Sequence, residues 1–137
     1  MKRILFIILI LVAIGLTACE SGSGGSDTNT ISTLVLVPSE FAGQSNPLGV
    51  DAAVAGGEVF KTNCEACHGP QGHGDGPVGA ALNPAPKNLA QLQAAAGDDY
   101  LFWRISTGKP GTSMVGWQGV LTDEQIWQII VFIRTLK

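Results

Sequence analysis

Apolar side chains near the C-terminus recur at intervals of three and four residues, the spacing of one face of an α-helix. They are Ile126, Ile129, Ile130, Ile133 and Leu136, and the stripe is widened by Trp127, Val131 and Phe132. The residues just before them, Thr122 to Gln125, have the pattern of a capping box, which begins a helix. We therefore expect a helix from this box to about Leu136 that is buried on more than one face.

Three earlier segments also have helix start and stop signals. They are residues 51–63, 88–96 and 98–107. The side chains of Asp51, Asn88 and Asp98 can accept hydrogen bonds from a first helical turn, and we expect each residue to be the N-cap of its helix. Gly108 follows the third segment and is expected to end it in a left-handed conformation.

The stretches between these segments are rich in glycine and proline, which predicts loops. Residues 69–87 and 108–119 are two such stretches. No segment alternates regularly between polar and apolar residues, so no sheet is expected. Gly56 and Gly57 lie inside the first helix, where each costs about 0.8–1 kcal/mol relative to alanine. We therefore expect another backbone to pass close to them.

The N-terminus has the composition of an export signal. Lys2 and Arg3 precede an apolar run over residues 4–16, and the sequence Leu-Thr-Ala-Cys ends at Cys19. The run is shorter than the roughly 20 apolar residues that span a bilayer. The segment resembles a bacterial lipoprotein signal, which implies cleavage before Cys19, a lipid on its sulfur and anchoring on the periplasmic or extracytoplasmic face of the cell membrane. An uncleaved anchor, or a plain signal in which Cys19 is incidental, is the alternative.

These signals divide the chain into four parts. They are a predicted lipoprotein signal (1–18), Cys19 with a flexible Gly- and Ser-rich tether (19–30), an extended segment (31–50) and a folded domain (51–137). The extended segment begins with a β-branched, apolar stretch over residues 31–37 and is interrupted by Pro38 and Pro47. It is expected either to wrap around the domain or to dock on a partner.

Charge and cysteine content narrow the function. The 137 residues have a formal net charge of -3 and no run of Lys or Arg. Nucleic-acid binding requires a concentrated basic face, so it is not expected. The three cysteines cannot form a closed set of internal disulfides, and each therefore needs its own explanation.

Cys64-Glu-Ala-Cys67-His68 is the strongest chemical signal in the chain. Two thiols at this spacing can add across the two vinyl groups of one haem, with the adjacent histidine held under the iron, so the motif predicts covalent attachment of haem c. A structural zinc site would need four N or S ligands, and Cys64, Cys67, His68 and His73 are the available set. A thioredoxin-like pair would need a βαβ setting, and a plain disulfide would leave His68 without a role.

From about Ala52 to Lys137 the chain resembles the class I cytochrome c family. The features that carry the resemblance are Gly56 and Phe60 ahead of the attachment motif, Gly69 after it, Met114 in a loop, and an aromatic last helix. The resemblance implies an all-α cytochrome c fold, with three to five short helices wrapped around one covalently attached haem. It also implies that the first and last helices cross, with Gly56 and Phe60 against Ile129 and Phe132.

Met114 is the expected second axial ligand, opposite His68. It lies in a Gly- and Pro-containing loop, and the only other methionine is Met1. A thioether ligand favours ferrous iron and raises the reduction potential. A core methionine that fills a gap is the alternative. Val115 follows Met114 where the family usually has proline, which weakens the expected rigidity of the loop.

Other residues are expected to support the site. In the family a proline carbonyl accepts the Nδ1 proton of the axial histidine, and Pro77, Pro84 and Pro86 are the candidates here. His73 follows His68 too closely to reach the other side of the iron, and is expected to be a solvent-side loop residue. Five further residues are expected either to face the haem, its propionates or its edge, or to be ordinary core and surface residues. They are Lys87, Trp103, Arg104, Lys109 and Trp117.

The predicted function is single-electron transfer by a membrane-anchored monohaem cytochrome c. Both axial positions are filled, so we expect an electron carrier with no small-molecule substrate and no catalysis of its own. The signal, tether and single haem resemble the monohaem lipoprotein subunit of alternative complex III, a quinol-oxidising assembly. The expected partners are therefore redox proteins or subunits of a respiratory or photosynthetic complex. The alternatives are a haem enzyme or gas sensor with an open distal site, and a zinc-binding lipoprotein.

Overall fold

The structure is a computed structural model that describes residues 34–137. The predicted signal, Cys19 and the tether lie outside the described residues. Two short 3-10 turns and five α-helices follow one another along the described part of the chain. They are η2 (Val50–Ala52), α2 (Ala53–Asn63), α3 (Glu65–His68), η3 (Gly79–Ala81), α4 (Leu89–Leu92), α5 (Asp98–Thr107) and α6 (Asp123–Ile133).

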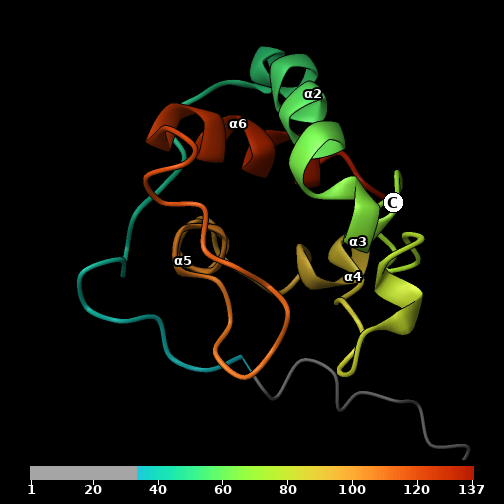
Figure 1. Cartoon of the computed structure of the whole chain (residues 1–137). Helices are drawn as coiled ribbons and strands as arrows, with labels where there is room; N and C mark the ends of the chain where they lie inside the picture. The colour runs from blue at the N-terminus through green and yellow to red at the C-terminus, as the bar shows by residue number, and fades with distance from the viewer. Residues whose placement is uncertain (1–33) are drawn as a thin grey trace, which may run out of the picture. The chain divides into compact units, whose positions relative to one another are not determined.

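The fold is all-α, as predicted. Residues 34–137 contain no strand, and the only β-type pairing among them is an isolated bridge between Gln118 and Leu121. Figure 1 shows α2 crossing α6 in the upper part of the domain, with α5 below them and the short helices α3 and α4 to one side. The long loops that the glycine and proline content predicts connect these helices.

The crossing of α2 and α6 depends on Gly56. A Cβ atom on Gly56 would run into the backbone carbonyl of Gln128, so the two helices touch backbone to backbone at this point. Next to the contact, the rings of Phe60 and Phe132 pack with their centroids 5.0 Å apart. The predicted meeting of the first and last helices is therefore confirmed, and it explains why a glycine is accepted inside α2.

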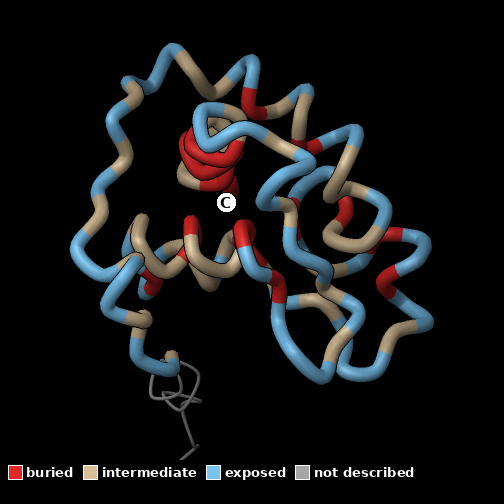
Figure 2. The backbone as a smooth tube through the Cα atoms, turned by 60° about the vertical axis from the view of Figure 1, so that its left-hand side comes forward, coloured by how far each residue is buried: buried red, intermediate tan, exposed pale blue. Residues whose placement is uncertain are grey.

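Helix α6 supplies most of the core. Its side chains at Ile126, Ile129 and Ile130 are no more than 1% exposed, and Figure 2 shows the buried residues concentrated along this helix. The capping box is present, because Gln125 N donates to Thr122 Oγ1 and Thr122 N donates to Gln125 Oε1. The helix ends at Ile133, earlier than the prediction, because the last residues form tighter turns that still bury Leu136.

One predicted cap is confirmed and two are wrong. The side chain of Asn88 accepts a hydrogen bond from Gln91 N and caps α4, which is shorter than predicted and ends at Leu92. Asp51 caps nothing, because it lies within η2 and α2 begins two residues later without a side-chain cap. Asp98 is the first residue of α5 and makes no capping bond, because its carboxylate has other partners.

Those partners are Arg134 and Asn46. Asp98 Oδ1 lies 2.7 Å from Arg134 Nη2, and Asp98 Oδ2 accepts from Asn46 N at 3.1 Å. Arg134 also donates to the carbonyl oxygens of Gln93 and Ala96. The pair therefore joins the end of α6, the turn before α5 and the segment that precedes η2.

We call this preceding segment, residues 34–49, the N-terminal strap. It forms no strand and instead lies along the domain, as the teal trace in Figure 1 shows. Gly43 N donates to Asp99 Oδ2, and Asn46 Nδ2 donates to Trp127 O at 2.9 Å. Three strap side chains, from Leu34, Phe41 and Leu48, pack against the core. Of the two expectations for this segment, the described part follows the first and contacts its own domain.

Candidate functional site

Cys64, Cys67 and His68 are brought together by the junction of α2 and α3. The chain bends at Cys64, whose φ of -120° interrupts the helix, while Cys64 N still donates to Phe60 O at 2.7 Å. The Cys64 carbonyl then accepts from both Cys67 N and His68 N, at 3.1 and 2.9 Å. A single helical turn therefore presents two thiols and an imidazole at one place on the domain.

Both thiols are free and partly buried. Burial raises the pKa of the Cys64 thiol to about 12, and the nearby charge of Cys67 acts on it in the same direction. A thiol with this pKa is protonated at neutral pH. The two cysteines are joined within this turn by the hydrogen bond from Cys67 N to Cys64 O, as attachment to one ligand through both would require.

His68 is oriented by a main-chain oxygen. Its Nδ1 atom lies 3.2 Å from the carbonyl oxygen of Lys87. Burial lowers the pKa of the imidazole, and the bond to Lys87 opposes this only in part. A neutral imidazole that donates from Nδ1 has its lone pair on Nε2, the form that binds a metal.

The prediction that Pro77, Pro84 or Pro86 provides this oxygen is wrong, because Lys87 provides it. The acceptor is a backbone atom that every residue type has, so residue identity carried no signal for it. The glycine-rich loop after α3 places the Lys87 carbonyl next to His68. Leu89 N donates to Gly72 O at 2.6 Å, and Gly74 N donates to His68 O at 2.8 Å.

Gly74 is required for this arrangement. Its φ of +83° lies in the left-handed region, and a Cβ atom on it would run into the carbonyl of Pro86. Gly79 similarly leaves room for the carbonyl of Cys67. The loop can therefore fold tightly under His68 and hold the Lys87 carbonyl against it.

Met114 lies in a loop whose base is fixed to the end of α5. Gly108 ends α5 with a positive φ of +72°, but its ψ of -162° lies outside the left-handed helical region that was predicted, and a Cβ atom on it would run into the carbonyl of Met114. Lys109 N donates to Met114 O at 3.0 Å, and Met114 N donates to Thr112 Oγ1 at 3.2 Å. Met114 is half-buried and is thus carried on an anchored loop, although Val115 replaces the usual proline.

The side chain of His73 makes no hydrogen bond to Cys64, Cys67, His68 or Met114. Its side chain is exposed, and its Nε2 atom lies 3.1 Å from the carbonyl oxygen of Lys137. Within residues 34–137, no three or more His, Cys, Asp or Glu side chains are grouped so that they could hold a metal ion. The zinc alternative therefore gains no support from the described part of the chain.

Two buried polar atoms of α5 have no hydrogen-bond partner among the described residues. They are Arg104 Nε and Ser106 Oγ. Such atoms are rare in folded proteins, and each calls for a partner beyond the described residues, such as ordered water or a bound group. Both residues immediately precede the Met114 loop, so these atoms, the paired thiols and the neutral imidazole fit a bound haem.

The fold and the site together define a c-type cytochrome. Its candidate attachment residues are Cys64 and Cys67, and its candidate iron ligands are His68 and Met114.

The chain belongs to the family described as cytochrome c oxidase, cbb3-type, subunit III, whose model matches residues 51–133. Two relatives are the cbb3-type cytochrome c oxidase subunits FixPc of Rhizobium leguminosarum bv. viciae and FixP of Bradyrhizobium sp. (strain ORS 278). FixPc is 32% identical over 92 residues, which cover 67% of this chain and 30% of FixPc. FixP is 36% identical over 90 residues, which cover 64% of this chain and 28% of FixP. The chain thus spans about three tenths of the length of these relatives.

A solved structure has a similar fold. It is the reducing HAO-like protein complex of Kuenenia stuttgartiensis, one chain of which matches with a TM-score of 0.54 and 18% sequence identity. The match covers 78% of this chain and 49% of the other. Of the helices in residues 34–137, none is long and apolar enough to cross a membrane.

Family membership and fold confirm that the chain is a monohaem class I c-type cytochrome that carries covalently bound haem c. Electron transfer is the role of a domain of this family.

Proposed function

We propose that this chain transfers single electrons at the surface of a bacterial membrane, with haem c attached through Cys64 and Cys67 and with His68 and Met114 as the axial ligands. When bound, haem c supplies a one-electron ferric–ferrous couple. The residues of the chain would hold this group, provide its axial ligands and thereby keep a reactant from binding to its iron.

The hydrogen bond from His68 Nδ1 to the Lys87 carbonyl is the observation that supports this proposal most directly. It fixes the tautomer and the ring orientation that an iron ligand requires, at a histidine directly adjacent to Cys67. Neither a disulfide nor a thioredoxin-like pair would need a histidine held in this way.

Met114 is proposed as the second ligand because its loop is fastened at both ends. Besides the bond from Lys109 N, Trp117 N donates to Ile105 O and Gln118 N donates to Ser106 O, at 2.9 and 3.0 Å. A methionine in the core would not need a dedicated loop, and an exposed one would not need a fixed base. With both axial positions filled, the chain would carry electrons rather than transform a substrate.

The partners are proposed to be subunits of a membrane respiratory complex. The relatives are named as subunits of cbb3-type cytochrome c oxidases, which supports a place next to a terminal oxidase. The resemblance to the monohaem subunit of alternative complex III would instead place the chain next to a quinol-oxidising complex. A lipid on Cys19, preceded by a cleaved signal, would anchor the chain to the outer face of the membrane in either case.

The visible spectrum of the purified protein tests the haem ligation. We expect a pyridine haemochrome of haem c that survives denaturation, a methionine-to-iron charge-transfer band in the ferric form, and no carbon monoxide binding to the ferrous form. Met114→Ala should abolish the band and allow carbon monoxide to bind. A wild-type protein that binds carbon monoxide readily would instead support the haem enzyme or gas sensor, and a colourless protein would contradict haem binding.

Detergent phase partitioning tests the anchor. The full-length chain expressed in a bacterium should enter the detergent phase, and Cys19→Ala should leave it in the aqueous phase. Gel filtration of solubilised membranes then separates the two kinds of partner. Co-migration with an oxidase, as opposed to a quinol-oxidising assembly, would support the placement that the relatives suggest, and migration of the chain alone would contradict a fixed subunit.

A further inference from the structure

The first residues of the N-terminal strap expose apolar side chains to water. Leu34 packs against the core, whereas Val35 is 54% exposed and Leu36 is 93% exposed. Leu36 is the most exposed large apolar side chain within residues 34–137. Adjacent apolar side chains that the domain leaves uncovered are typical of a surface that meets a partner or a membrane.

The backbone of this segment is also unpaired. Within residues 34–137, no backbone–backbone hydrogen bond involves residues 34–37. Their N–H and C=O groups therefore need water or other polar partners. The headgroup region of a bilayer supplies such partners and its hydrocarbon core does not, so the segment is suited to the membrane interface and not to deeper insertion.

The position of the exposed pair is nevertheless fixed on the domain. On one side of it, Leu34 packs against the core. On the other side, Phe41 packs against Phe102 with ring centroids 6.4 Å apart, and Gly43 N donates to Asp99 Oδ2 at 3.0 Å. The direction of the pair relative to the domain is therefore set by contacts at both of its ends.

The sequence connects this pair to the proposed lipid. Cys19 precedes Leu36 by 17 residues, and a flexible linker of that length spans roughly 21–25 Å on average. Residues 28–39 contain no charged side chain. The pair thus lies within reach of the membrane surface, and no neighbouring charge has to be desolvated when it makes contact.

Val50 and Val54 provide a comparison elsewhere on the domain. They are 89% and 79% exposed, but Asp51 and Glu58 flank them on η2 and α2 and are exposed as well. A lipid contact here would bring both carboxylates to the membrane at a cost in desolvation. Exposure alone therefore does not identify the contact, whereas exposure, absence of charge and nearness to the anchor coincide only at the start of the strap.

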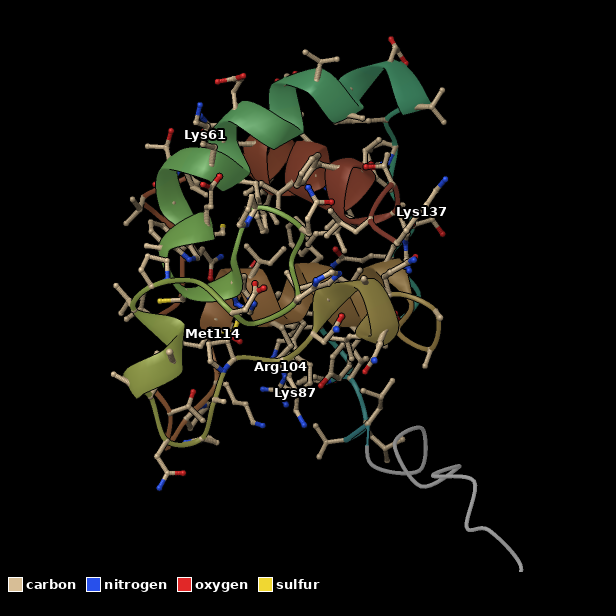
Figure 3. All side chains as sticks on the ribbon, turned by 90° about the vertical axis from the view of Figure 1, so that its right-hand side faces the viewer. Lys61, Lys87, Arg104, Met114 and Lys137 are labelled. Carbon is tan, nitrogen blue, oxygen red and sulfur yellow. The ribbon has the colours of Figure 1, made fainter. Side chains whose placement is uncertain are left out.

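The strap begins at one particular end of the domain. Figures 1 and 3 show its first residues at the lower end. In Figure 3, Met114 and Lys87 lie in the same lower half, and Lys61 of α2 lies near the top. Lys87 is exposed, and a cation at this end is attracted by anionic headgroups. A membrane that meets the start of the strap therefore faces the Met114 end of the domain.

We infer that Val35 and Leu36 contact the boundary between lipid headgroups and acyl chains, and that they thereby orient the Met114 end of the domain toward the membrane. The inference rests on the lipid anchor on Cys19 proposed above and adds a second point of attachment to it. Two points of attachment restrict the orientation of the domain, which a single flexible tether does not. The Met114 loop is then presented to redox partners within the membrane.

A fluorescent label at position 36 tests the contact. Leu36→Cys and Val54→Cys are each labelled with the environment-sensitive dye NBD in the lipidated holoprotein, in vesicles of phosphatidylethanolamine and phosphatidylglycerol. The emission of the label at position 36 should shift to the blue, and nitroxide groups on the acyl chains should quench it while iodide no longer does. The label at position 54 should emit as in water and be quenched by iodide.

Two results at position 36 would overturn the inference. The first is quenching by iodide as strong as at position 54, which would leave the segment in water. The second is protection from both quenchers, which would indicate contact with a second copy of the chain and not with lipid.

Energy transfer to a dye on the lipid headgroups tests the orientation. A donor on Lys87→Cys should transfer more energy than a donor on Lys61→Cys, because the two exposed positions lie in opposite halves of the domain. Equal transfer from the two positions would overturn the inference.

Serine substitutions test whether the strap causes this difference. Val35→Ser combined with Leu36→Ser should abolish the difference in energy transfer. Val50→Ser combined with Val54→Ser is the matched control, because it also removes two exposed apolar side chains, and it should retain the difference. A difference that survives the strap substitutions would overturn the role of the strap.

Detergent phase partitioning separates this inference from the proposed function. A wild-type chain that stays in the aqueous phase would contradict both the anchor and the contact. A wild-type chain that enters the detergent phase, but whose label at position 36 remains in water, would contradict the contact alone. The haem attachment is checked independently by the pyridine haemochrome, which should be the same in every variant.

Discussion

His68 Nδ1 lies 3.2 Å from the carbonyl oxygen of Lys87, and this one contact joins the attachment motif to the loop that follows it. The carbonyl belongs to a main chain held by Gly72 and Gly74, so the position of the imidazole is determined by the backbone of residues 69–89. The side chain of Lys87 itself takes no part in the contact.

Replacing this side chain should therefore have little effect on the iron. We expect Lys87→Ala to retain the ferric methionine band and to change the midpoint potential only slightly. Gly74→Ala is the contrasting variant, because its new Cβ would displace the carbonyl of Pro86 next to Lys87 and would be strained at a φ of +83°. Its spectrum should show altered axial ligation, and a Lys87→Ala protein that loses the band while Gly74→Ala keeps it would contradict this account.

The lowered pKa of His68 predicts a dependence of stability on pH. Burial disfavours the protonated imidazole, and iron ligation through Nε2 in the haem-loaded protein would disfavour it further, so the pKa of His68 in the folded chain lies below 6.5. Between the folded pKa and 6.5 the unfolded chain binds more protons, and the free energy of unfolding therefore rises with pH. This stabilisation is complete above pH 6.5 and is lost as the pH falls towards the folded pKa. Denaturant titrations at a series of pH values check it.

His73→Ala is the control for that experiment, because it removes the other histidine, which is exposed. The pH dependence should persist in this variant. Stability that increases on acidification below pH 6.5 in both proteins would contradict the assignment.

The backbone contact at Gly56 predicts a large effect from a single methyl group. Gly56→Ala places its Cβ against the carbonyl of Gln128, which cannot move without separating α2 from α6. We expect it to lower the free energy of unfolding by about 1–3 kcal/mol. Gly57→Ala is the matched control, because its Cβ meets the Phe132 ring at 3.2 Å and a small shift of the ring can accommodate it. Equal denaturation midpoints for the two variants would show that backbone contact does not limit the crossing.

The contacts of Asp98 with Arg134 and Asn46 predict that removing its carboxylate loosens the N-terminal strap from the domain. Asp98→Ala removes the acceptor of Asn46 N and leaves Arg134 with carbonyl partners only. Because both side chains are about three tenths exposed (28% and 31%), we expect a loss of about 1–3 kcal/mol and not that of a fully buried pair. Hydrogen exchange of the strap amides should accelerate more than exchange in α6. Uniform acceleration throughout the domain would contradict a local role.

The two attachment cysteines are predicted to be needed for folding. The chain is short, and its buried apolar cluster is small, so the macrocycle should supply much of the core. We expect Cys64→Ala combined with Cys67→Ala to give a chain without a cooperative unfolding transition in circular dichroism. Met114→Ala, which leaves both thioether links possible, should remain folded. A cooperative, haem-free double variant would refute the prediction.

The features that could be predicted from the sequence are those in which the interacting residues are close in the chain or are fixed by sterics. The Thr122–Gln125 box closes on itself, so its geometry follows from its own residues. Gly56 could be assigned to a helix contact because only a residue without a side chain fits there. The attachment motif has all three of its chemical groups within one turn.

The features that could not be predicted depend on partners far along the chain. Asp98 has the residue type of an N-cap, but its carboxylate binds Arg134, 36 residues away, and the longer-range pair takes the place of the cap. The acceptor for His68 could not be found from residue types because it is a main-chain carbonyl. The unpaired Nε of Arg104 became evident only when its surroundings were known.

The Met114 loop has a base closed by main-chain hydrogen bonds and a tip at Gly111, where a Cβ atom would meet nothing within 4 Å. Length and composition at such a tip can change without disturbing the closure beneath it. The tip of the loop can therefore be replaced independently of its base. Replacements at Pro110 and Gly111 could alter the surface offered to a redox partner, while Thr112 keeps its hydrogen bond to Met114 N and the thioether stays on its fixed base.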